Sequence, residues 1–509
     1  MSYPLALLSG VLLALSFPKF GHPAFAWVAL VPLLIALSGW QAGPGRLLGQ
    51  PVHRAAAMGW LAAFVYVVGT LYWTSEVVAT FGGLSTPFAV FAMLMLAAFL
   101  ALFPAVSAII TARLITRGGV AGIYFLPGAW VATEFFREHL FGGFPWVPLG
   151  NSQVTVLPVA QLASVAGVYG VSALVAFVNA SVAFALLTVG RTRVKAIAVA
   201  ALVLISTAAW GTWRIATGTL TTEGTPLRVG LVQANIAQED KWRESEARRI
   251  FTTHIGLTRD VVRRGAELVL WPEASTPFTF EGDAEGEAAM RALAREVKVP
   301  ILFGSDQDVT DPPGHYNAAF LLGADGGTVA VYRKIHLVPF GEYVPFSSWL
   351  SFFPPLVQTL AGFAPFNPGT EVVLLPIGDR VVSTAICYEV VYPSLIRQAV
   401  QGGTQLLTTI TNDGWYGRSS APFQHFEMAT MRAIEQGRYL ARAANTGISG
   451  VIDPYGRVVQ RSAIFEEAGI VAEVRLLTSR TLYSVLGDAI AYVAIALTAA
   501  ALLTVKRRV

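Results

Sequence analysis

The first 215 residues contain seven long runs of apolar residues separated by short polar or turn-forming segments, and an eighth run lies near the end of the chain. A helix needs roughly 20 apolar residues to cross the hydrocarbon core of a bilayer. The pattern therefore predicts about eight membrane-crossing helices, over residues 3–17, 24–38, 55–73, 88–112, 119–135, 160–188, 196–213 and 489–505. Pro104 lies within the fourth run, where we expect a kink.

Basic residues gather in alternate loops between these runs, whereas the intervening loops carry only Lys19 and Arg137. The basic loops and the tail contain Arg46, Arg54, Arg113, Arg117, Arg191, Arg193, Lys195, Lys506, Arg507 and Arg508. Short cytoplasmic loops are enriched in Lys and Arg, so we expect both termini in the cytoplasm and the segment between the last two runs on the periplasmic side. The first run has no basic segment before it and further runs follow at once, so we expect a retained helix rather than a cleaved signal peptide.

From about residue 226 to 477 the pattern changes to short β-branched runs that alternate with amphipathic stretches. Expected strands cover 227–233, 267–271, 300–303, 318–322, 329–332, 381–387, 406–410, 447–452 and 458–461. Expected helices cover 244–264, 286–297, 393–401 and 423–436, and turn-forming sequences at 324–327 and 453–456 predict two hairpins. Strands interleaved with helices predict a layered α/β domain.

Composition agrees with this division of the chain. Charged residues make up 13% of the sequence and the mean hydropathy is +0.56, whereas ordinary soluble domains carry roughly 25% charged residues. We expect a membrane domain with seven transmembrane helices over 1–215, an extracytoplasmic α/β domain over 216–484, and a last transmembrane helix with a basic cytoplasmic tail over 485–509. The basic loops and tail explain the net charge of +4, so no nucleic-acid partner is expected.

Two features lie near the predicted outer end of the fifth apolar run. Glu134, Arg137, Glu138 and His139 are either functional or simply solvated at the membrane surface, and solvation is the favoured interpretation. The segment 141–150 that follows is aromatic, rich in Gly and Pro, and uncharged. We expect it to hold lipid or to anchor the fold at the outer interface.

Three residues with reactive side chains follow β-branched runs of the α/β segment: Glu273, Lys334 and Cys387. Cys387 is the only cysteine, so it cannot form an intramolecular disulfide. A cysteine nucleophile needs a base and groups that stabilise an oxyanion; a glutamate can take the thiol proton, and a lysine can lower the pKa of the thiol and support the oxyanion. Singly, each residue also has a plain structural explanation, which for a buried cysteine is packing.

Taken together, the sequences around these residues resemble a known superfamily. They are Trp-Pro-Glu ending at Glu273, Tyr-Arg-Lys ending at Lys334 with Pro-Phe-Gly-Glu downstream, and Cys-Tyr-Glu beginning at Cys387 with Thr-Asn-Asp-Gly-Trp downstream. These motifs resemble the carbon–nitrogen hydrolase (nitrilase) superfamily and its Glu-Lys-Cys triad. With apolar runs on both sides of the domain, the whole chain is similar to the membrane family of bacterial apolipoprotein N-acyltransferases.

The resemblance implies an αββα sandwich of nitrilase type in the bacterial inner membrane. The implied reaction moves an acyl chain from a phospholipid donor, through a thioester on Cys387, to the α-amino group of the N-terminal diacylglyceryl-cysteine of a lipoprotein. In this ping-pong scheme Glu273 is the base and Lys334 holds the oxyanion together with backbone N–H groups. No cofactor, nucleotide or metal is needed.

Further site residues follow from the same resemblance. Glu342 is expected to position Lys334 or the incoming amine, and Tyr388 and Glu389 to shape the pocket of the nucleophile. Trp242 and Trp415 are expected to contact lipid or substrate, or merely to lie at an interface. The histidines that could offer a Cys-His alternative are His315, His336 and His425, but nothing in their spacing favours it.

Two other functions share parts of this pattern. A membrane-tethered amidase or nitrilase that hydrolyses a small C–N substrate would use the same triad with water in place of the amine. Eight crossings are an elaborate anchor for a soluble substrate, so lipid is the favoured donor. A transporter or receptor with an inactive domain is the third possibility, and the scarcity of ionisable residues inside the apolar runs argues against it.

Overall fold

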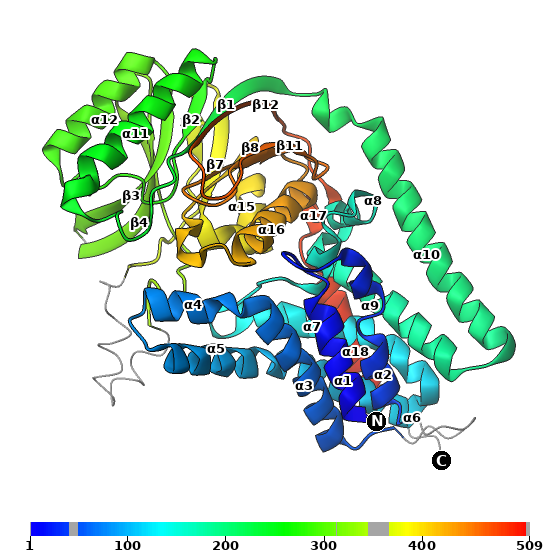
Figure 1. Ribbon diagram of the computed structural model, residues 1–509. Coiled ribbons are helices and arrows are strands. Elements are labelled where there is room, and N and C mark those ends of the chain that lie inside the picture. Colours follow the sequence, from blue (N-terminus) through cyan, green and yellow to red (C-terminus); the bar gives the residue numbers. More distant parts are fainter. Residues whose placement is uncertain (1, 40–48, 312, 345–365, 505–509) are drawn as a thin grey trace.

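The computed structural model describes residues 2–39, 49–311, 313–344 and 366–504, and consists of a helical region and an α/β region (Figure 1). Arg46 and the basic residues 506–508, on which the predicted topology partly depends, lie outside the described residues. The α/β region lies above the helical region in the view of Figure 1, and the long helix α10 (Gly190–Thr217) runs from the lower end of the helical region up to the first strand.

The helical region forms a bundle in which α1 packs against α3, and α18 and α9 pack against α7. The main helices of this bundle are α1 (Ser2–Ala14), α2 (Val31–Leu37), α3 (Val52–Leu71), α6 (Leu102–Gly118), α7 (Leu126–His139), α9 (Ala163–Leu187) and α18 (Ala489–Thr504). Among the described residues, four helical stretches are long and apolar enough to cross a membrane: Val52–Leu71, Thr86–Gly142, Ala163–Leu187 and Gly190–Thr221. Shorter apolar helices cover Ser2–Ala14, Pro23–Leu37 and Ala489–Thr504.

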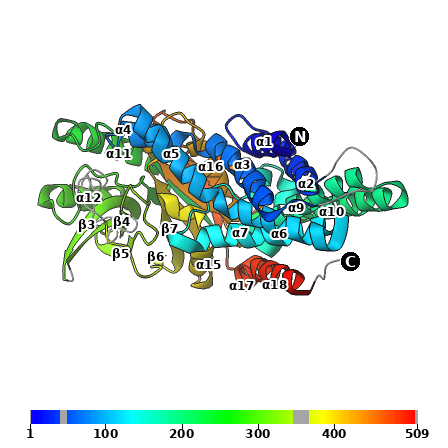
Figure 2. The same ribbon diagram turned by 90° about the horizontal axis from the view of Figure 1, so that it is seen from below.

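The fourth predicted crossing, over residues 88–112, is not one straight helix. The chain forms α5 (Thr86–Leu100) and α6, which meet at Ala101. Pro104 explains the break, because it has no N–H to donate to the carbonyl of Leu100 and its ring crowds that carbonyl. Figures 1 and 2 show α5, together with α4 (Trp73–Thr80), extending from the bundle beneath the α/β region instead of running beside α1 and α7. The expected kink is present as a break between α5 and α6, and the number of crossings that this segment forms stays a prediction.

The α/β region contains two six-stranded sheets. The first has the order β12-β1-β2-β3-β4-β5, with β12 Ala468–Leu476, β1 Thr225–Gln233, β2 Leu268–Leu270, β3 Ile301–Thr310, β4 Pro313–Leu322 and β5 Thr328–Arg333. The second has the order β11-β10-β9-β8-β7-β6, with β11 Val458–Arg461, β10 Gly450–Ile452, β9 Leu440–Ala444, β8 Leu406–Thr411, β7 Arg380–Ile386 and β6 Leu375–Ile377. Both predicted hairpins are confirmed, because β4 pairs antiparallel with β5 and β10 with β11. The predicted α/β class is therefore confirmed.

Apolar side chains from both sheets share one buried core, which includes Leu231 and Leu270 of the first sheet and Ile386 and Ile410 of the second. Helices α11 (Glu244–Arg263) and α12 (Ala284–Val297) pack on the first sheet. Helices α15 (Pro393–Gln401) and α16 (Ala421–Gln436) accompany the second sheet, and α16 also packs against α9 of the bundle (Figure 1). The second sheet is thus the one that faces the helical region.

At the end of α7 the favoured interpretation, solvation, agrees with the exposed side chain of His139 but is wrong for the other three residues. Glu134, Arg137 and Glu138 are all buried. Glu134 Oε1 accepts hydrogen bonds from Trp130 Nε1 (2.9 Å) and Leu149 N (2.7 Å). Glu134 therefore holds the end of α7 to the loop that follows it.

That loop, 141–150, joins the helical region to the α/β region. The Tyr392 hydroxyl donates to Gly143 O (3.1 Å), and the rings of Phe144 and Trp146 lie 6.0 and 6.3 Å from the ring of Tyr388, the residue after the cysteine. The structure confirms that the segment anchors the fold, and contact with lipid stays a prediction.

Candidate active site

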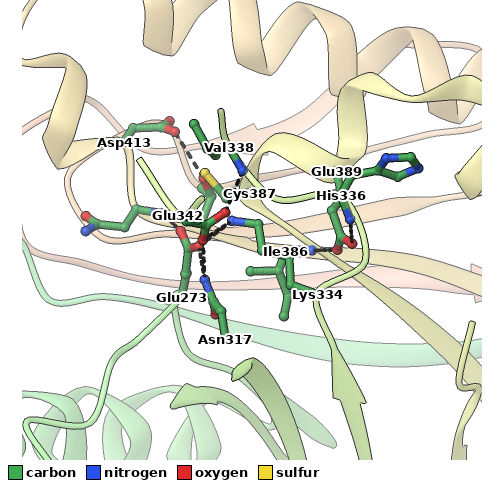
Figure 3. Close-up of polar contacts among 12 residues, drawn as sticks. Glu273, Asn317, Lys334, His336, Val338, Glu342, Ile386, Cys387, Glu389 and Asp413 are labelled. Atoms are coloured by element: carbon green, nitrogen blue, oxygen red, sulfur yellow. Dashed lines mark hydrogen bonds and ion pairs between the residues drawn. The ribbon is translucent and has the colours of Figure 1, made fainter. Parts of the chain in front are cut away.

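The structure brings Glu273, Lys334 and Cys387 together at the ends of three strands (Figure 3). Lys334 directly follows β5, Cys387 directly follows β7, and Glu273 lies three residues beyond β2. The exposed fraction is 6% for Glu273, 1% for Lys334 and 4% for Cys387. Strands of two different sheets therefore deliver a carboxylate, an ammonium group and a thiol to one buried site.

Lys334 is the centre of a network of charged groups. Its Nζ donates to Glu273 Oε1 (3.0 Å) and to Glu342 Oε1 (2.8 Å). Asn317, on β4, donates from Nδ2 to the same two oxygens, at 2.8 and 2.9 Å. Glu273 Oε2 accepts from Asn412 N (3.0 Å). The predicted position of Glu342 beside Lys334 is thus observed, and the carboxylate of Glu273 is held at both oxygens.

The backbone at Cys387 is unusual. Its φ is +53°, in the left-handed region that a residue with a side chain rarely adopts, and it is the first residue of the short 3-10 helix η6 (Cys387–Val391). Such a conformation costs on the order of 1–3 kcal/mol and persists only where its surroundings hold it. The N–H groups in the first turn of a helix have no partner within that helix, and the thiol lies at that end of η6.

The charges of the three groups follow from burial and from one another. Burial first, and then the carboxylate of Glu273, raise the pKa of Cys387 to about 12, although Lys334 acts in the opposite direction. Burial opposes the charge on Glu273, but Lys334 and other donors outweigh it and hold the pKa of Glu273 below its ordinary value. Burial also opposes the charge on Lys334, and its two carboxylate neighbours outweigh it and raise its pKa. The resting site therefore holds a neutral thiol, a carboxylate and an ammonium group, so the expected lowering of the thiol pKa by Lys334 is not the net result.

Glu389 is fully buried and binds backbone N–H groups instead of facing the thiol. Its Oε1 accepts from Ile335 N (2.6 Å), His336 N (3.1 Å) and the Tyr332 hydroxyl (2.8 Å), and its Oε2 accepts from Ile386 N (2.7 Å). This one carboxylate therefore ties the segment after Lys334 to the residue before Cys387. Tyr388, by contrast, points toward the helical region, where it meets Phe144 and Trp146.

The two tryptophans have different surroundings. Trp242 is 55% exposed, in the segment between β1 and α11. The ring of Trp415 meets the ring of Phe81 edge to face at 4.9 Å and lines a cavity of about 360 Å³ together with Glu76 of α4. The structure thus places Trp415 at a cavity between the two regions and Trp242 on the surface.

The three histidines that could have formed a Cys-His pair have other partners than the thiol of Cys387. His315 bonds to Asp308, and His336 stacks on Tyr392. His425 Nε2 lies 3.0 Å from the main-chain oxygen of Cys387, not its sulfur. Within the described ranges, no group of three or more His, Cys, Asp or Glu side chains is arranged to hold a metal ion.

Two residues of the site, Asn317 and Lys241, were not predicted from the sequence. Asn317 lies on β4 directly before its apolar part, one residue outside the predicted strand 318–322, so the strand pattern did not include it. Lys241 is buried and its Nζ donates to the main-chain oxygen of Glu273 (3.0 Å), although it lies beside the exposed Trp242 in sequence. No sequence pattern distinguished Lys241 from a solvated lysine.

A two-sheet α/β domain that carries a buried Glu, Lys and Cys at its strand ends defines an enzyme domain of the carbon–nitrogen hydrolase class. The sequence model of carbon-nitrogen hydrolase matches residues 228–482, and that of the apolipoprotein N-acyltransferase N-terminal domain matches residues 9–181. The chain belongs to the apolipoprotein N-acyltransferase family.

Curated relatives match nearly the whole chain. Apolipoprotein N-acyltransferase of Geobacter metallireducens is 38% identical over 97% of this chain and 93% of its own length. The proteins of the same name from Brucella melitensis and Methylococcus capsulatus are 34% and 33% identical, over 92% and 95% of this chain and 88% and 92% of their own lengths. Together with the apolar helices, this membership makes the protein an N-acyltransferase of the inner membrane.

Proposed function

We propose that this enzyme transfers an acyl chain from a phospholipid to the α-amino group of an N-terminal diacylglyceryl-cysteine, through a thioester on Cys387. The observation that carries the proposal is the contact between Glu273, Lys334 and Glu342 beside a buried thiol, next to a helical region of apolar helices. A thiol at the junction with a membrane region can reach a lipid ester.

In the first half-reaction, Glu273 takes the proton of Cys387 as the sulfur attacks the ester carbonyl of the phospholipid. The raised pKa of the thiol favours this order, because the proton must leave during the attack. Lys334 and a backbone N–H stabilise the oxyanion of the tetrahedral intermediate. Glu273 then returns the proton to the departing alkoxide, and a lysophospholipid leaves the thioacyl-enzyme.

In the second half-reaction, the neutral α-amino group attacks the thioester carbonyl. Glu273 takes a proton from the amine and returns it to the departing sulfur, which regenerates the thiol. Glu342 lies 2.8 Å from Lys334 and is well placed to keep that lysine charged and fixed. The later exchange of the thioester for an amide is downhill and draws the first half-reaction forward, so the overall transfer from ester to amide needs no nucleotide.

The proposal includes the arrangement in the membrane. We assign residues 1–215 to a membrane domain, 216–484 to the catalytic domain and 485–509 to a last crossing helix with its tail. About eight crossings would place both termini in the cytoplasm and the catalytic domain in the periplasm, and the two sheets with helices on their outer faces would form an αββα sandwich. All the predicted crossings overlap helices, although residues 24–38 and 119–135 are partly 3-10 helix, and the α5–α6 break supports an interfacial course for α5.

The sidedness can be tested with one new cysteine on α12. Ala288 is exposed, and Ala288→Cys in a Cys387→Ser background leaves a single reactive thiol. A membrane-impermeant maleimide should label it in cells with a permeabilised outer membrane, without lysis. Labelling only after the inner membrane is broken would place the domain in the cytoplasm.

The function itself is tested by supplying purified enzyme in detergent with a phospholipid and a diacylglyceryl-cysteine peptide. The expected product is the N-acylated peptide, formed in step with lysophospholipid. An amidase would instead release ammonia from small amides and give no acylated peptide, and that result would favour the membrane-tethered hydrolase. The matched control is the same peptide with an acetylated amino terminus, which should stay unmodified.

A further inference from the structure

His425 is a buried histidine to which the proposed mechanism gives no role. It lies on α16, and its ring is enclosed with Asp413 and Arg442, which are also fully buried. His425 Nδ1 lies 3.0 Å from Asp413 Oδ1 and 3.1 Å from Arg442 Nη2, and Arg442 Nη2 donates to Asp413 Oδ2 at 2.8 Å. Although burial opposes it, Arg442 and His425 lower the pKa of Asp413 to about 2, so this carboxylate stays ionised.

The second ring nitrogen of His425, Nε2, contacts the main chain of the residue that carries the thiol. Nε2 lies 3.0 Å from the main-chain oxygen of Cys387. A carbonyl oxygen only accepts hydrogen bonds, so Nε2 must carry a proton whether the ring is neutral or charged. A protonated Nε2 cannot take the thiol proton, which excludes His425 as the base of a Cys-His pair.

The bonded oxygen belongs to the peptide between Cys387 and Tyr388. This peptide is trans, so its C=O and its N–H point in opposite directions. Fixing the oxygen of Cys387 therefore fixes the direction of the N–H of Tyr388. That N–H lies in the first turn of η6, where donors have no partner within the helix, and it is one residue from the attacking sulfur.

We propose that His425 is a positioning residue that aims the Tyr388 N–H at the oxyanion of the tetrahedral intermediate. Glu389, which is itself part of η6, accepts a hydrogen bond from Ile386 N, so the end of β7 just before the strained Cys387 is also held in place. Asp413 and Arg442 fix the ring of His425 in turn. The inference rests on the proposed thioester chemistry, but it concerns any acyl donor that forms an oxyanion at Cys387.

A pair of substitutions separates this role from a structural one. In His425→Gln the amide nitrogen can occupy the position of Nε2 and still donate to Cys387 O, whereas in His425→Asn the shorter side chain faces Asp413 and withdraws that donor. Loss of one oxyanion donor costs about 10²–10³-fold in rate, so we expect the Asn variant to acylate that much more slowly than wild type and the Gln variant to stay within about tenfold. The same substitutions at His254, a buried histidine that bonds its own helix at Ile250 O, serve as controls and should show no such split.

The experiment measures formation of the acyl-enzyme from a phospholipid and from a p-nitrophenyl ester, alongside alkylation of Cys387 by iodoacetamide. Alkylation forms no oxyanion, so both variants should be alkylated at the wild-type rate. Equal loss of acylation in the Gln and Asn variants overturns the proposal, as does a parallel loss of alkylation, which would show that His425 acts on the thiol. The p-nitrophenyl ester separates this inference from the proposed function. If the wild type forms an acyl-enzyme from the ester but not from phospholipid, the proposed function is wrong, and the role of His425 is still tested with the ester.

Discussion

On the side of the first sheet, the charged side chains of the active site face one another: Glu273, Lys334 and Glu342 are joined by ion pairs and by Asn317. On the side of the second sheet, two buried side chains hold main-chain atoms beside the nucleophile, and Asp413 and Arg442 pair behind one of them. Glu389 binds three backbone N–H groups and His425 lies against the oxygen of Cys387. The first side sets protonation states and the second sets the direction of peptide bonds. Substitutions on the two sides should therefore fail in different ways.

The largest effect is expected from the nucleophile, where the two sides meet. Cys387→Ser should reduce acyl transfer by at least about 10⁴-fold, because a hydroxyl is a much weaker nucleophile than a thiol in the same place. The isosteric change leaves the ion pairs of Lys334 intact, so the melting temperature in detergent should stay at the wild-type value. Acyl transfer assays and a thermal melt test this together, and retained transfer would remove Cys387 as the nucleophile.

On the first side, Glu273→Gln should slow acylation by about 10²–10⁴-fold through loss of the general base. The pH dependence gives a sharper result. Burial, the largest cause of the raised pKa of Cys387, remains in the variant, so it reacts only through a small thiolate fraction that grows as pH rises. Its acylation rate should climb steadily from neutral to alkaline pH, whereas the wild-type rate stays flat because Glu273, with its lowered pKa, is already ionised.

The control for this substitution is Glu285→Gln, on the exposed first turn of α12. It should change neither the rate nor its pH dependence. A flat profile for Glu273→Gln would mean that another group takes the thiol proton.

On the second side, Glu389→Gln should act mainly on stability. The amide keeps one acceptor oxygen and turns its NH₂ group toward a backbone donor that the carboxylate satisfied. Leaving buried donors unsatisfied costs about 1–3 kcal/mol, which should appear as a lower melting temperature. The acylation rate of the folded Glu389→Gln protein should fall, but it should not rise with pH as the rate of Glu273→Gln does. A rate that rises with pH in the same way would mean that Glu389 takes part in the proton transfers of the active site.

The smallest effect is expected at Trp242. Because its side chain is 55% exposed, Trp242→Ala should change the free energy of unfolding by no more than about 0.5 kcal/mol. Any loss of activity should appear in KM for a lipid substrate. Trp415→Ala is the comparison, since that ring packs on Phe81 beside a cavity and its loss should lower the melting temperature further. Equal effects of the two substitutions would contradict the different surroundings of the rings.

The sequence predicts the two sides of the site unequally, for a physical reason. Glu273, Lys334 and Cys387 each follow a β-branched run, and that local pattern indicates the strand end that carries each residue. His425 reaches Cys387 across 38 residues through the packing of α16 beside the second sheet, and Asn317 reaches Glu273 across 44 residues through the pairing of β2, β3 and β4. The strands β6, β9 and β12 also escaped prediction; β9 reads Leu-Ala-Arg-Ala-Ala, without a β-branched residue, and is a strand because it lies between β8 and β10.

Burial was likewise beyond the local pattern at the end of α7. Glu134 and Glu138 are acidic residues at the end of an apolar helix, where solvation is the usual outcome. Glu134 is held by the loop 141–150, which folds back onto the α/β region, and Glu138 is bonded by Tyr169 of α9 and Ser394 of α15. The contact depends on both regions, so neither segment alone predicts it.

In the proposed mechanism, Cys387 carries the acyl chain between two lipid substrates. It is tested most directly by incubating the enzyme with a phospholipid of defined acyl chain, without an amine acceptor, and measuring the mass of the intact protein and of its peptides. If Cys387 forms the thioester, the peptide that contains it should carry one added acyl group, which neutral hydroxylamine removes. The acyl group should also move to a diacylglyceryl-cysteine peptide when that peptide is added. An unmodified Cys387 under conditions in which the complete reaction turns over would contradict it.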